Sequence, residues 1–476
     1  MANHGSRPSA PGVDGPRSLF EPPRVAAPAL LTRDEADAVT KKVLSFATAD
    51  ETRVTIGSSA SGNMRFAVNQ VSTSGDSFDT TITVRSTFGK RSASSTTNKR
   101  DDASLKSVVE RAEALAKLAP EDPEAMPELG PQNYATSSAA WSDATAALDA
   151  AKRANAVNAI TSVAKAENLV STGFLDVNVG AFSIGNNKGM FAYHRQTAVA
   201  LTTTVRTPDG TGSGWAGATA NDFTTIDAAA LGRRAADKAK RSTNSVAIEP
   251  GRYTVVLEPT AVANMVQLIG GSLNARAADE GRSFFSKPGG GTKIGMKVVD
   301  ERVTLISDPN DPETPGAPFS FDGQPMGRRV WIENGVLKTL AYDRYWAQRQ
   351  GVPPNGGAGG GLMMSGGDAT IEQMIASTER GILCTRFWYI RGVDQRTILF
   401  TGLTRDGTFL IENGKVTRAI KNMRWNESPI FMLNNLEMMG RPVRVSSSES
   451  GSAGQAVVVP PIKARDFNFT SASDAV

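Results

Sequence analysis

One order of elements recurs in the first half of the chain and restricts its fold more than any other feature. Residues 32–46 and 103–118 have the apolar spacing of helices, and the segments between them alternate like half-buried antiparallel strands. The same order of helix, three strands and helix returns over residues 143–241. Because each element has one apolar face, the pattern predicts helices packed on an antiparallel sheet.

The two runs also share a short stretch of sequence. "TTITVR" at 80–85 is echoed by "TTTVR" at 202–206, and Ser104 in the first following helix matches Thr225 at the same offset. We interpret this as a possible internal duplication of an α-β-β-β-α unit, with chance similarity as the alternative. The expected strands are 53–59, 64–73 and 78–87 in the first unit, and 174–185, 189–197 and 199–207 in the second.

The second half of the chain is richer in glycine and in hairpin signals. Asn334-Gly335 and Asn413-Gly414 each lie between strand-like runs, where a two-residue turn with positive φ is needed. Thr370 and Gln373 have the spacing of a capping box at the start of a short helix. These features predict a mostly β domain that carries a few helices.

The predicted fold class is therefore α+β, with an N-terminal α/β domain built on an antiparallel sheet and a mostly β C-terminal domain. We place a disordered leader at 1–30, because this stretch is rich in proline and has little periodicity. The N-terminal domain spans 31–248, as two repeat-like halves with a break near 120–140, and the C-terminal domain spans 249–476.

Charge and composition exclude several classes of function. The formal net charge of +4 comes from 52 basic and 48 acidic residues, which are interspersed, so we expect no nucleic-acid partner. No apolar run is long enough to span a membrane, and the N-terminus lacks the order of a signal peptide. The single cysteine excludes an internal disulfide framework. A soluble, cytoplasmic protein is expected.

Few side chains could carry catalysis. The chain has two histidines, and only His194 lies in a segment expected to be structured, on a strand face shared with Ala192 and Gln196. Cys384 alternates with Arg386 on another expected strand. Each has an ordinary structural interpretation, as a hydrogen-bonded strand histidine and a buried apolar cysteine. A catalytic thiol at Cys384 would need a base and an electropositive setting.

A central segment carries no ionisable side chain at all. An apolar run from Tyr253 to Leu257 is typical of a buried strand, and the helical spacing that follows continues to Leu273. Between Glu258 and Arg276 every residue is uncharged. The sequence therefore predicts a core strand that leads into a helix with an apolar inner face.

The second half resembles a known family in its order of motifs. "RRVWIENGVLKTLAYDRYWAQRQG" is followed by the glycine loop "NGGAGG", then by "GILCTRFWYIRGVDQRTILFTGLTRDGTFLIENGKV" and "NMRWNESPIFMLNNLEMMG". These segments resemble the TldD/PmbA family, also called the modulator-of-DNA-gyrase family. Upstream, "RFAVNQV" and "GMFAYHRQT" are similar to two strand motifs of the family, so that the resemblance covers roughly 31–465.

The resemblance implies a cytosolic bacterial or archaeal heterodimer, in which TldD-type subunits are metalloproteases and TldE/PmbA-type subunits lack the metal site. Catalytic members carry H-E-x-x-x-H on the helix after the buried strand. Counting back from "FFS" at 284–286, the two histidine positions fall on Val266 and Gly271, and the glutamate position falls on Gln267. The family's late cysteine ligand has no counterpart either, because no cysteine follows Cys384.

The resemblance therefore implies a TldE/PmbA-like, non-catalytic subunit that binds no metal itself and pairs with a zinc-bearing TldD-type metalloprotease acting on peptides. Valine and glycine cannot bind zinc, and glutamine cannot take a proton from bound water as a carboxylate does. Two alternatives remain: a stand-alone enzyme that uses Cys384, with His194 as its base, and a homodimeric peptide-binding scaffold without protease activity.

Overall fold

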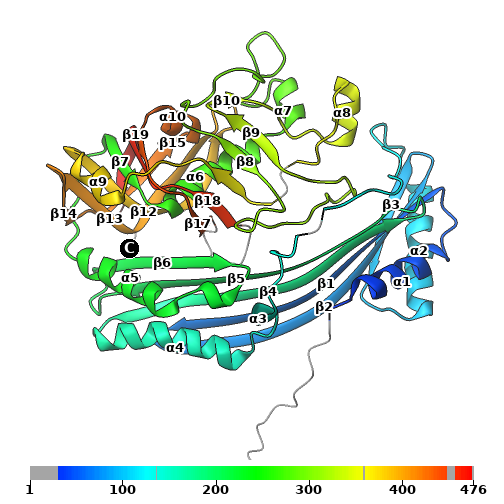
Figure 1. The fold of residues 1–476 in the computed structure, drawn as a ribbon, viewed down its shortest axis with the longest axis horizontal. Coiled ribbons are helices and arrows are strands. Elements are labelled where there is room, and N and C mark those ends of the chain that lie inside the picture. The colour runs from blue at the N-terminus through cyan, green and yellow to red at the C-terminus, as the bar shows by residue number, and fades with distance from the viewer. Residues whose placement is uncertain (1–29, 136, 358–359, 448–455, 474–476) are drawn as a thin grey trace, which may run out of the picture.

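The computed structural model describes residues 30–135, 137–357, 360–447 and 456–473; the leader expected at 1–30 lies, apart from residue 30, outside the described residues. The fold is α+β, and its first half contains the order helix, three strands, helix twice (Figure 1). The first unit comprises α1 (Arg33–Leu44), β1 (Glu51–Ala67), β2 (Gln70–Phe88), β3 (Arg91–Thr97) and α2 (Asp102–Leu118). After α3 (Asp143–Ala146), the second unit comprises α4 (Ala150–Ala166), β4 (Val170–Asn186), β5 (Phe191–Arg206), β6 (Ser213–Ala220), η1 (Phe223–Thr225) and α5 (Ala228–Arg241).

The six strands form one antiparallel sheet in the order β3-β2-β1-β4-β5-β6. The first strands of the two units meet in the middle, where Arg53 lies opposite Asn186 and Phe66 lies opposite Gly173. Each unit therefore extends from its own first strand toward an opposite edge of the sheet, with its three strands in sequence order. This arrangement repeats one α-β-β-β-α topology within the sheet.

The expected boundaries of several strands were wrong. Residues 53–59 and 64–73 are not separate strands, because β1 runs unbroken through the Gly- and Ser-rich stretch between them and pairs with β2 and β4 there. The ladder of backbone hydrogen bonds on both sides outweighs the low strand propensity of these residues. The chain turns instead at Val68 and Asn69, whose φ angles are 51° and 60°.

In the second unit, 189–197 and 199–207 form one strand, β5, and the third strand is β6, which the sequence did not reveal. β6 reads "SGWAGATA", with small residues of weak strand propensity. Their size is required by packing, since a Cβ at Gly214 would lie 2.2 Å from the carbonyl oxygen of Ala235 in α5. The close approach of α5 therefore explains why β6 consists of small residues, and these residues are the reason that the strand was not predicted.

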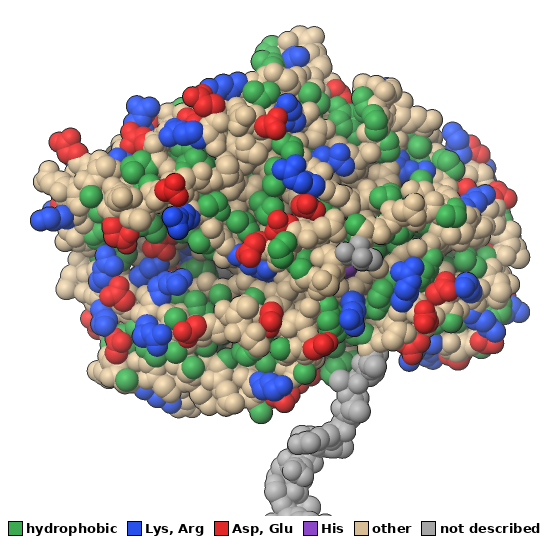
Figure 2. Space-filling model, viewed as in Figure 1, with side chains coloured by type: hydrophobic (Ala, Val, Ile, Leu, Met, Phe, Trp, Pro, Cys, Tyr) green, Lys and Arg blue, Asp and Glu red, His purple; other side chains and the backbone are tan. Residues whose placement is uncertain are grey.

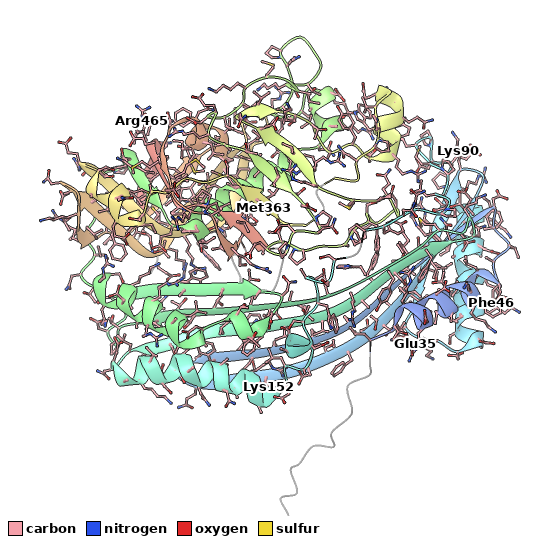
Figure 3. All side chains as sticks on the ribbon, viewed as in Figure 1. Glu35, Phe46, Lys90, Lys152, Met363 and Arg465 are labelled. Atoms are coloured by element: carbon pink, nitrogen blue, oxygen red, sulfur yellow. The ribbon has the colours of Figure 1, made fainter. Side chains whose placement is uncertain are left out.

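Helices cover one face of this sheet, and the other face is turned toward the second half of the chain (Figure 1). α1 begins with a capping box, in which Thr32 and Glu35 bond reciprocally. Lys152 of α4 and Glu35 of α1 lie on this outer helical layer (Figure 3). On the opposite face, Ile184 and Ala192 pack with Phe319 from the second half.

The second half contains a closed barrel. Its strands are β7 (Gly251–Leu257), β12 (Arg380–Asp394), β13 (Leu399–Glu412), β15 (Asn422–Glu427) and β19 (Ile462–Ser473). They pair in the order β12-β7-β19-β15-β13, and an additional pairing of β12 with β13 closes the ring. β14 (Lys415–Ala419) pairs outside the ring with β13, and β16 (Leu436–Met439) with β19.

A second sheet of six short strands has the order β10-β9-β8-β11-β18-β17. The strands are β8 (Leu305–Ser307), β9 (Arg329–Glu333), β10 (Val336–Leu337), β11 (Leu362–Met364), β17 (Val443–Ser446) and β18 (Ala456–Val459). The helices of this half are α6 (Pro259–Ser272), α7 (Ala275–Asp279), α8 (Arg344–Gln350), α9 (Ile371–Ala376) and α10 (Pro429–Asn434). α6 packs between the barrel and the second sheet, in the largest apolar core of the molecule.

The local signals of the second half are confirmed. Both Asn-Gly turns have the positive φ angles that a two-residue hairpin needs, 49° and 77° at Asn334-Gly335 and 49° and 75° at Asn413-Gly414. The capping box of Thr370 and Gln373 opens α9. Short-range turn and cap chemistry was therefore readable from the sequence.

The face of the molecule seen in Figure 2 carries interspersed charges of both signs. None of the described helices is long and apolar enough to cross a membrane.

The two halves are joined by polar contacts. The Tyr134 hydroxyl donates to the carbonyl oxygen of Gly323 at 2.7 Å, and Lys238 forms an ion pair with Glu258 at 2.6 Å.

Candidate functional site

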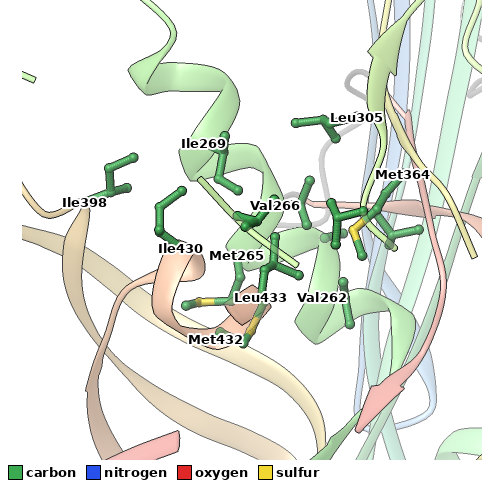
Figure 4. Packing of buried hydrophobic residues seen from close by; sticks show 14 of the residues in the cluster. Val262, Met265, Val266, Ile269, Leu305, Met364, Ile398, Ile430, Met432 and Leu433 are labelled. Atoms are coloured by element: carbon green, nitrogen blue, oxygen red, sulfur yellow. The ribbon is translucent and has the colours of Figure 1, made fainter. Parts of the chain in front are cut away.

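The uncharged central segment folds as α6, directly after the barrel strand β7. Proline at its first position and the spacing of Val262, Met265, Val266 and Ile269 explain why it is helical and which face it buries. All four of these side chains are fully buried. Figure 4 shows them facing side chains of α10 and of strands β8 and β11. The inner face of α6 is thus filled by hydrocarbon.

The three positions that the family resemblance assigns to metal chemistry have different surroundings. Val266 is fully buried in the apolar core. Gln267 is half-buried, and its Nε2 donates to the carbonyl oxygen of Ser447 at 3.3 Å. Gly271 faces open space, since an added Cβ would meet no atom within 4 Å. None of the three supplies a zinc ligand or a carboxylate base, so these residues do not fit a zinc ion.

Asn264 is the buried polar side chain of α6, and it lies close to Gln267 in the helix. Its Oδ1 accepts from the backbone N–H of Phe387 at 3.1 Å, and its Nδ2 donates to the carbonyl oxygen of Ser447 at 3.0 Å. The side chain is 1% exposed. The two side-chain amides of α6 are therefore used to join the helix to β12 and to the end of β17.

The N-terminus of α6 carries a charged cluster that sequence reasoning missed. Glu258 precedes the helix, forms an ion pair with Lys238 of α5 at 2.6 Å, and accepts a hydrogen bond from the Thr385 hydroxyl at 3.3 Å. Both charged side chains are largely buried. Only the long-range meeting of α5 with β7 and β12 brings these residues together, so no local motif reveals them. The cluster anchors α6 to the N-terminal half.

Cys384 and His194 lie in different sheets. Cys384 is on β12 in the barrel and is completely buried. Burial, with a smaller contribution from the charge of Glu258, raises the pKa of its thiol. His194 is on β5, where burial lowers the pKa of the imidazole despite a hydrogen bond with Gln196. The fold thus separates these two residues and suppresses the thiolate that a nucleophile needs.

A second buried polar cluster lies where β6 meets the barrel. Asp406 accepts two hydrogen bonds from Arg386, at 2.6 and 3.1 Å, and one from the Ser213 hydroxyl at 2.7 Å. The Arg386 guanidinium also stacks over Trp215 at 4.8 Å. Burial raises the pKa of Asp406, but Arg386 and Ser213 together outweigh it, so its pKa lies below the ordinary value.

Beside this cluster is a pocket of about 280 Å³, lined largely by hydroxyl and amide side chains. The sequence signal that could have indicated it is the pair Asp406-Gly407, where the chain leaves regular strand geometry, with φ angles of 54° and 127°. Because Arg386 already satisfies Asp406, the carboxylate is not available as a base. Residues from both halves of the chain line the pocket.

Among the residues that the structure describes, no three His, Cys, Asp or Glu side chains come together as possible metal ligands. The arrangement offers glycine-rich loops, strand edges and the pocket beside Asp406. Such surfaces can hold an extended chain through backbone hydrogen bonds and need neither acid nor base.

Three domain models of one family match the chain consecutively. Residues 54–116 match the "PmbA/TldA metallopeptidase domain 1", residues 139–243 match the central domain, and residues 250–471 match the C-terminal domain.

Curated relatives include a "Metalloprotease" of Methanothermobacter thermautotrophicus, 25% identical over 48% of this chain and 52% of the relative. A "Zinc metalloprotease TldD homolog" of Saccharolobus solfataricus is 25% identical over 44% of this chain and 48% of the relative. The matches span about half the length of these relatives.

Among solved structures, TldE from Thermococcus kodakarensis superposes with a TM-score of 0.78 at 18% sequence identity, covering 92% of this chain and 100% of that chain. This likeness shows a shared fold over nearly the whole chain.

Proposed function

The chain belongs to the TldD/PmbA family, and we propose that within it this protein is a TldE/PmbA-like, non-catalytic subunit of a complex with a TldD-type metalloprotease. The complex would act on peptides or unfolded polypeptides in the cytoplasm. Zinc would be held by the partner. This chain would contribute the walls of the substrate chamber and backbone contacts to an extended peptide.

The observation that carries the proposal is the composition and packing of α6. The helix that follows the first barrel strand has no ionisable side chain between Glu258 and Arg276. Its inner positions are fully buried apolar residues, and its buried amide, Asn264, is already bonded on both sides. A zinc peptidase needs nitrogen, sulfur or carboxylate ligands and a base at such a site.

The scarcity of ligands elsewhere supports the same proposal. The full chain has two histidines and one cysteine, and the pKa of the buried cysteine is raised. His194 lies on β5 of the other sheet, remote in topology from α6. A partner that supplies the ligands is therefore the simplest way for a chain of this family to take part in peptide cleavage.

The test is co-expression with a TldD-type subunit from the same genome, with only one chain tagged. We expect the two chains to co-purify and to cleave unstructured peptides, with activity removed by a zinc chelator. The present chain alone should cleave nothing. The control is the same partner with its H-E-x-x-x-H glutamate replaced by glutamine, which should still co-purify but lose cleavage.

Two results would overturn the proposal. One is zinc-dependent peptide cleavage by this chain purified alone. The other is the absence of any complex with TldD-type subunits, together with a stable homodimer that binds peptides, which would favour the scaffold alternative.

A further inference from the structure

The second strand of the N-terminal sheet is much longer than its outer neighbour. β2 pairs with β1 from Gln70 to Thr87. On its other side β3 pairs only with Ile82–Phe88. Among the strands that the structure describes, none lies against the outer edge of Gln70–Thr81. At about 3.4 Å per residue this leaves roughly 40 Å of open strand edge.

This edge lacks lysine and proline, two of the devices that normally prevent strands from pairing, although its register with β1 shifts next to Val71. The segment Gln70–Thr81 reads "QVSTSGDSFDTT" and contains no lysine, arginine or proline. Two large apolar side chains are exposed along it, Val71 at 42% and Phe78 at 39%, and Val68 in the preceding turn is 69% exposed. An open edge with exposed apolar side chains is typical of a surface that another strand covers.

The position of the edge indicates what kind of chain covers it. β6 forms the opposite side of the sheet and contacts β13 and β17 of the second half, whereas β2 lies on the side away from the barrel (Figure 1). A strand added to Gln70–Thr81 would extend the sheet outward, on the side away from the barrel. This geometry suits a neighbouring subunit better than a substrate held against the barrel.

The charge of the segment favours pairing with a different subunit over pairing with a second copy of this chain. The segment contains Asp76 and Asp79 and no cation. Arg153 of α4 offsets Asp76 at 2.7 Å, whereas Asp79 bonds only to the Thr81 hydroxyl among its described contacts. Two copies paired antiparallel would bring acidic segments together, which is unfavourable. A strand that carries lysine or arginine would complement the segment.

We infer that the edge Gln70–Thr81 pairs with a basic edge strand of the partner subunit, so that one continuous sheet crosses the two chains. The inference rests on the proposed function, because it names the surface through which the metalloprotease subunit docks. Backbone hydrogen bonds would supply the attraction, while Val71 and Phe78 would be covered by the added strand.

Amide hydrogen exchange tests this pairing without altering the chain. In the isolated protein, we expect peptides covering 70–81 to contain both slow amides, bonded to β1, and fast amides on the open edge. Adding the TldD-type subunit should slow the fast group at least tenfold. Peptides covering α2, on the outer helical layer, serve as the internal reference and should not change.

A pair of variants provides an independent measurement. Phe78→Lys places a cation at the edge and should weaken the complex at least tenfold. Leu118→Lys makes the same change at an 84% exposed site on α2 and should leave the affinity unchanged. Thermal unfolding of both variants shows whether either has lost its fold; exchange on the unmodified protein decides the matter if Phe78→Lys does not fold.

The outcomes are distinguishable from those of the proposed function. A complex that forms while 70–81 keeps its fast amides overturns the edge pairing and leaves the proposed function standing. Failure of any complex to form overturns both. Protection of 70–81 in the isolated chain that rises with its concentration would show pairing with a second copy and overturn the assignment to a different subunit.

Discussion

The side-chain amide of Asn264 bonds to the backbone N–H of Phe387, at the point where β12 runs beyond its partner strand. β7 pairs with β12 only from Gly381 to Cys384. Past that point the edge of β12 would be left without a partner inside the core. Asn264 on α6 supplies the acceptor at 3.1 Å. A side chain of the helix therefore takes the place of a strand as the hydrogen-bond partner of β12 beyond the end of β7.

Replacing Asn264 by leucine should destabilise the protein by about 2 kcal/mol or more, because it leaves the buried N–H of Phe387 and the carbonyl of Ser447 unpaired. Urea unfolding followed by tryptophan fluorescence measures the change. Asn98→Leu, at an exposed position, is the control and should alter the free energy of unfolding by less than about 0.5 kcal/mol. Equal stabilities for the two variants would contradict this role for Asn264.

Two adjacent glycines of α6 should respond differently to alanine. At Gly271 an added Cβ meets no atom within 4 Å, so Gly271→Ala should stabilise the helix by up to about 1 kcal/mol. At Gly270 the Cβ would lie 2.6 Å from Cδ1 of Leu362, and the displacement of that side chain should cancel or reverse the gain. Thermal unfolding of the two variants compares them. A larger gain at Gly270 would show that the packing around α6 differs from that described.

The pH dependence of stability should reflect Asp406. Its folded-state pKa is lowered, so the carboxylate stabilises the fold above its unfolded pKa of about 3.9, and this contribution is lost as the pH falls through the lower folded value. Asp406→Asn leaves Arg386 buried beside a neutral partner and should cost about 3 kcal/mol at pH 7. The difference from the unmodified protein should shrink below about pH 4.

Chemical unfolding at a series of pH values measures this difference. Asp37→Asn removes one partner of an exposed ion pair with Lys41 and provides the comparison, with an expected effect of at most about 0.5 kcal/mol at any pH. A difference for Asp406→Asn that stays constant down to pH 2 would mean that the carboxylate is not the group that titrates.

The thiol of Cys384 should be inert in the folded protein. It is fully buried and its pKa is raised, so both access and thiolate formation are suppressed. A chromogenic disulfide reagent should label no thiol under native conditions and one per chain in denaturant, because the sequence has a single cysteine. Rapid native labelling that coincides with a loss of catalytic activity would revive the Cys384-dependent enzyme.

Local chemistry was the most predictable part of this fold. The capping box at Thr370 and the turns at Asn334 and Asn413 depend on interactions within a few residues, and each was predicted correctly. The helical spacing of α6 and its buried face were also confirmed. These features are determined by residues close together in sequence, so they can be predicted without knowing which distant segments pack against them.

Features set by distant partners could not be predicted in the same way. β6 is composed of small residues because α5 packs close to it, and β1 continues through glycine and serine because two neighbouring strands bind it. The contacts of Glu258 with Lys238 and of Asp406 with Ser213 join segments far apart in sequence. Roles for Val266, Gln267 and Gly271 stay predictions that follow from the family resemblance.

The closed barrel also sets an order of assembly during synthesis. β7 is complete at residue 257, but its two neighbours, β12 and β19, begin only at residues 380 and 462. Because distant pairings form only after long loops close, the N-terminal sheet can fold while β7 still waits for both neighbours. The ribosome must therefore release the chain through β19 before the barrel can close, and until then the apolar strand β7 is exposed to aggregation.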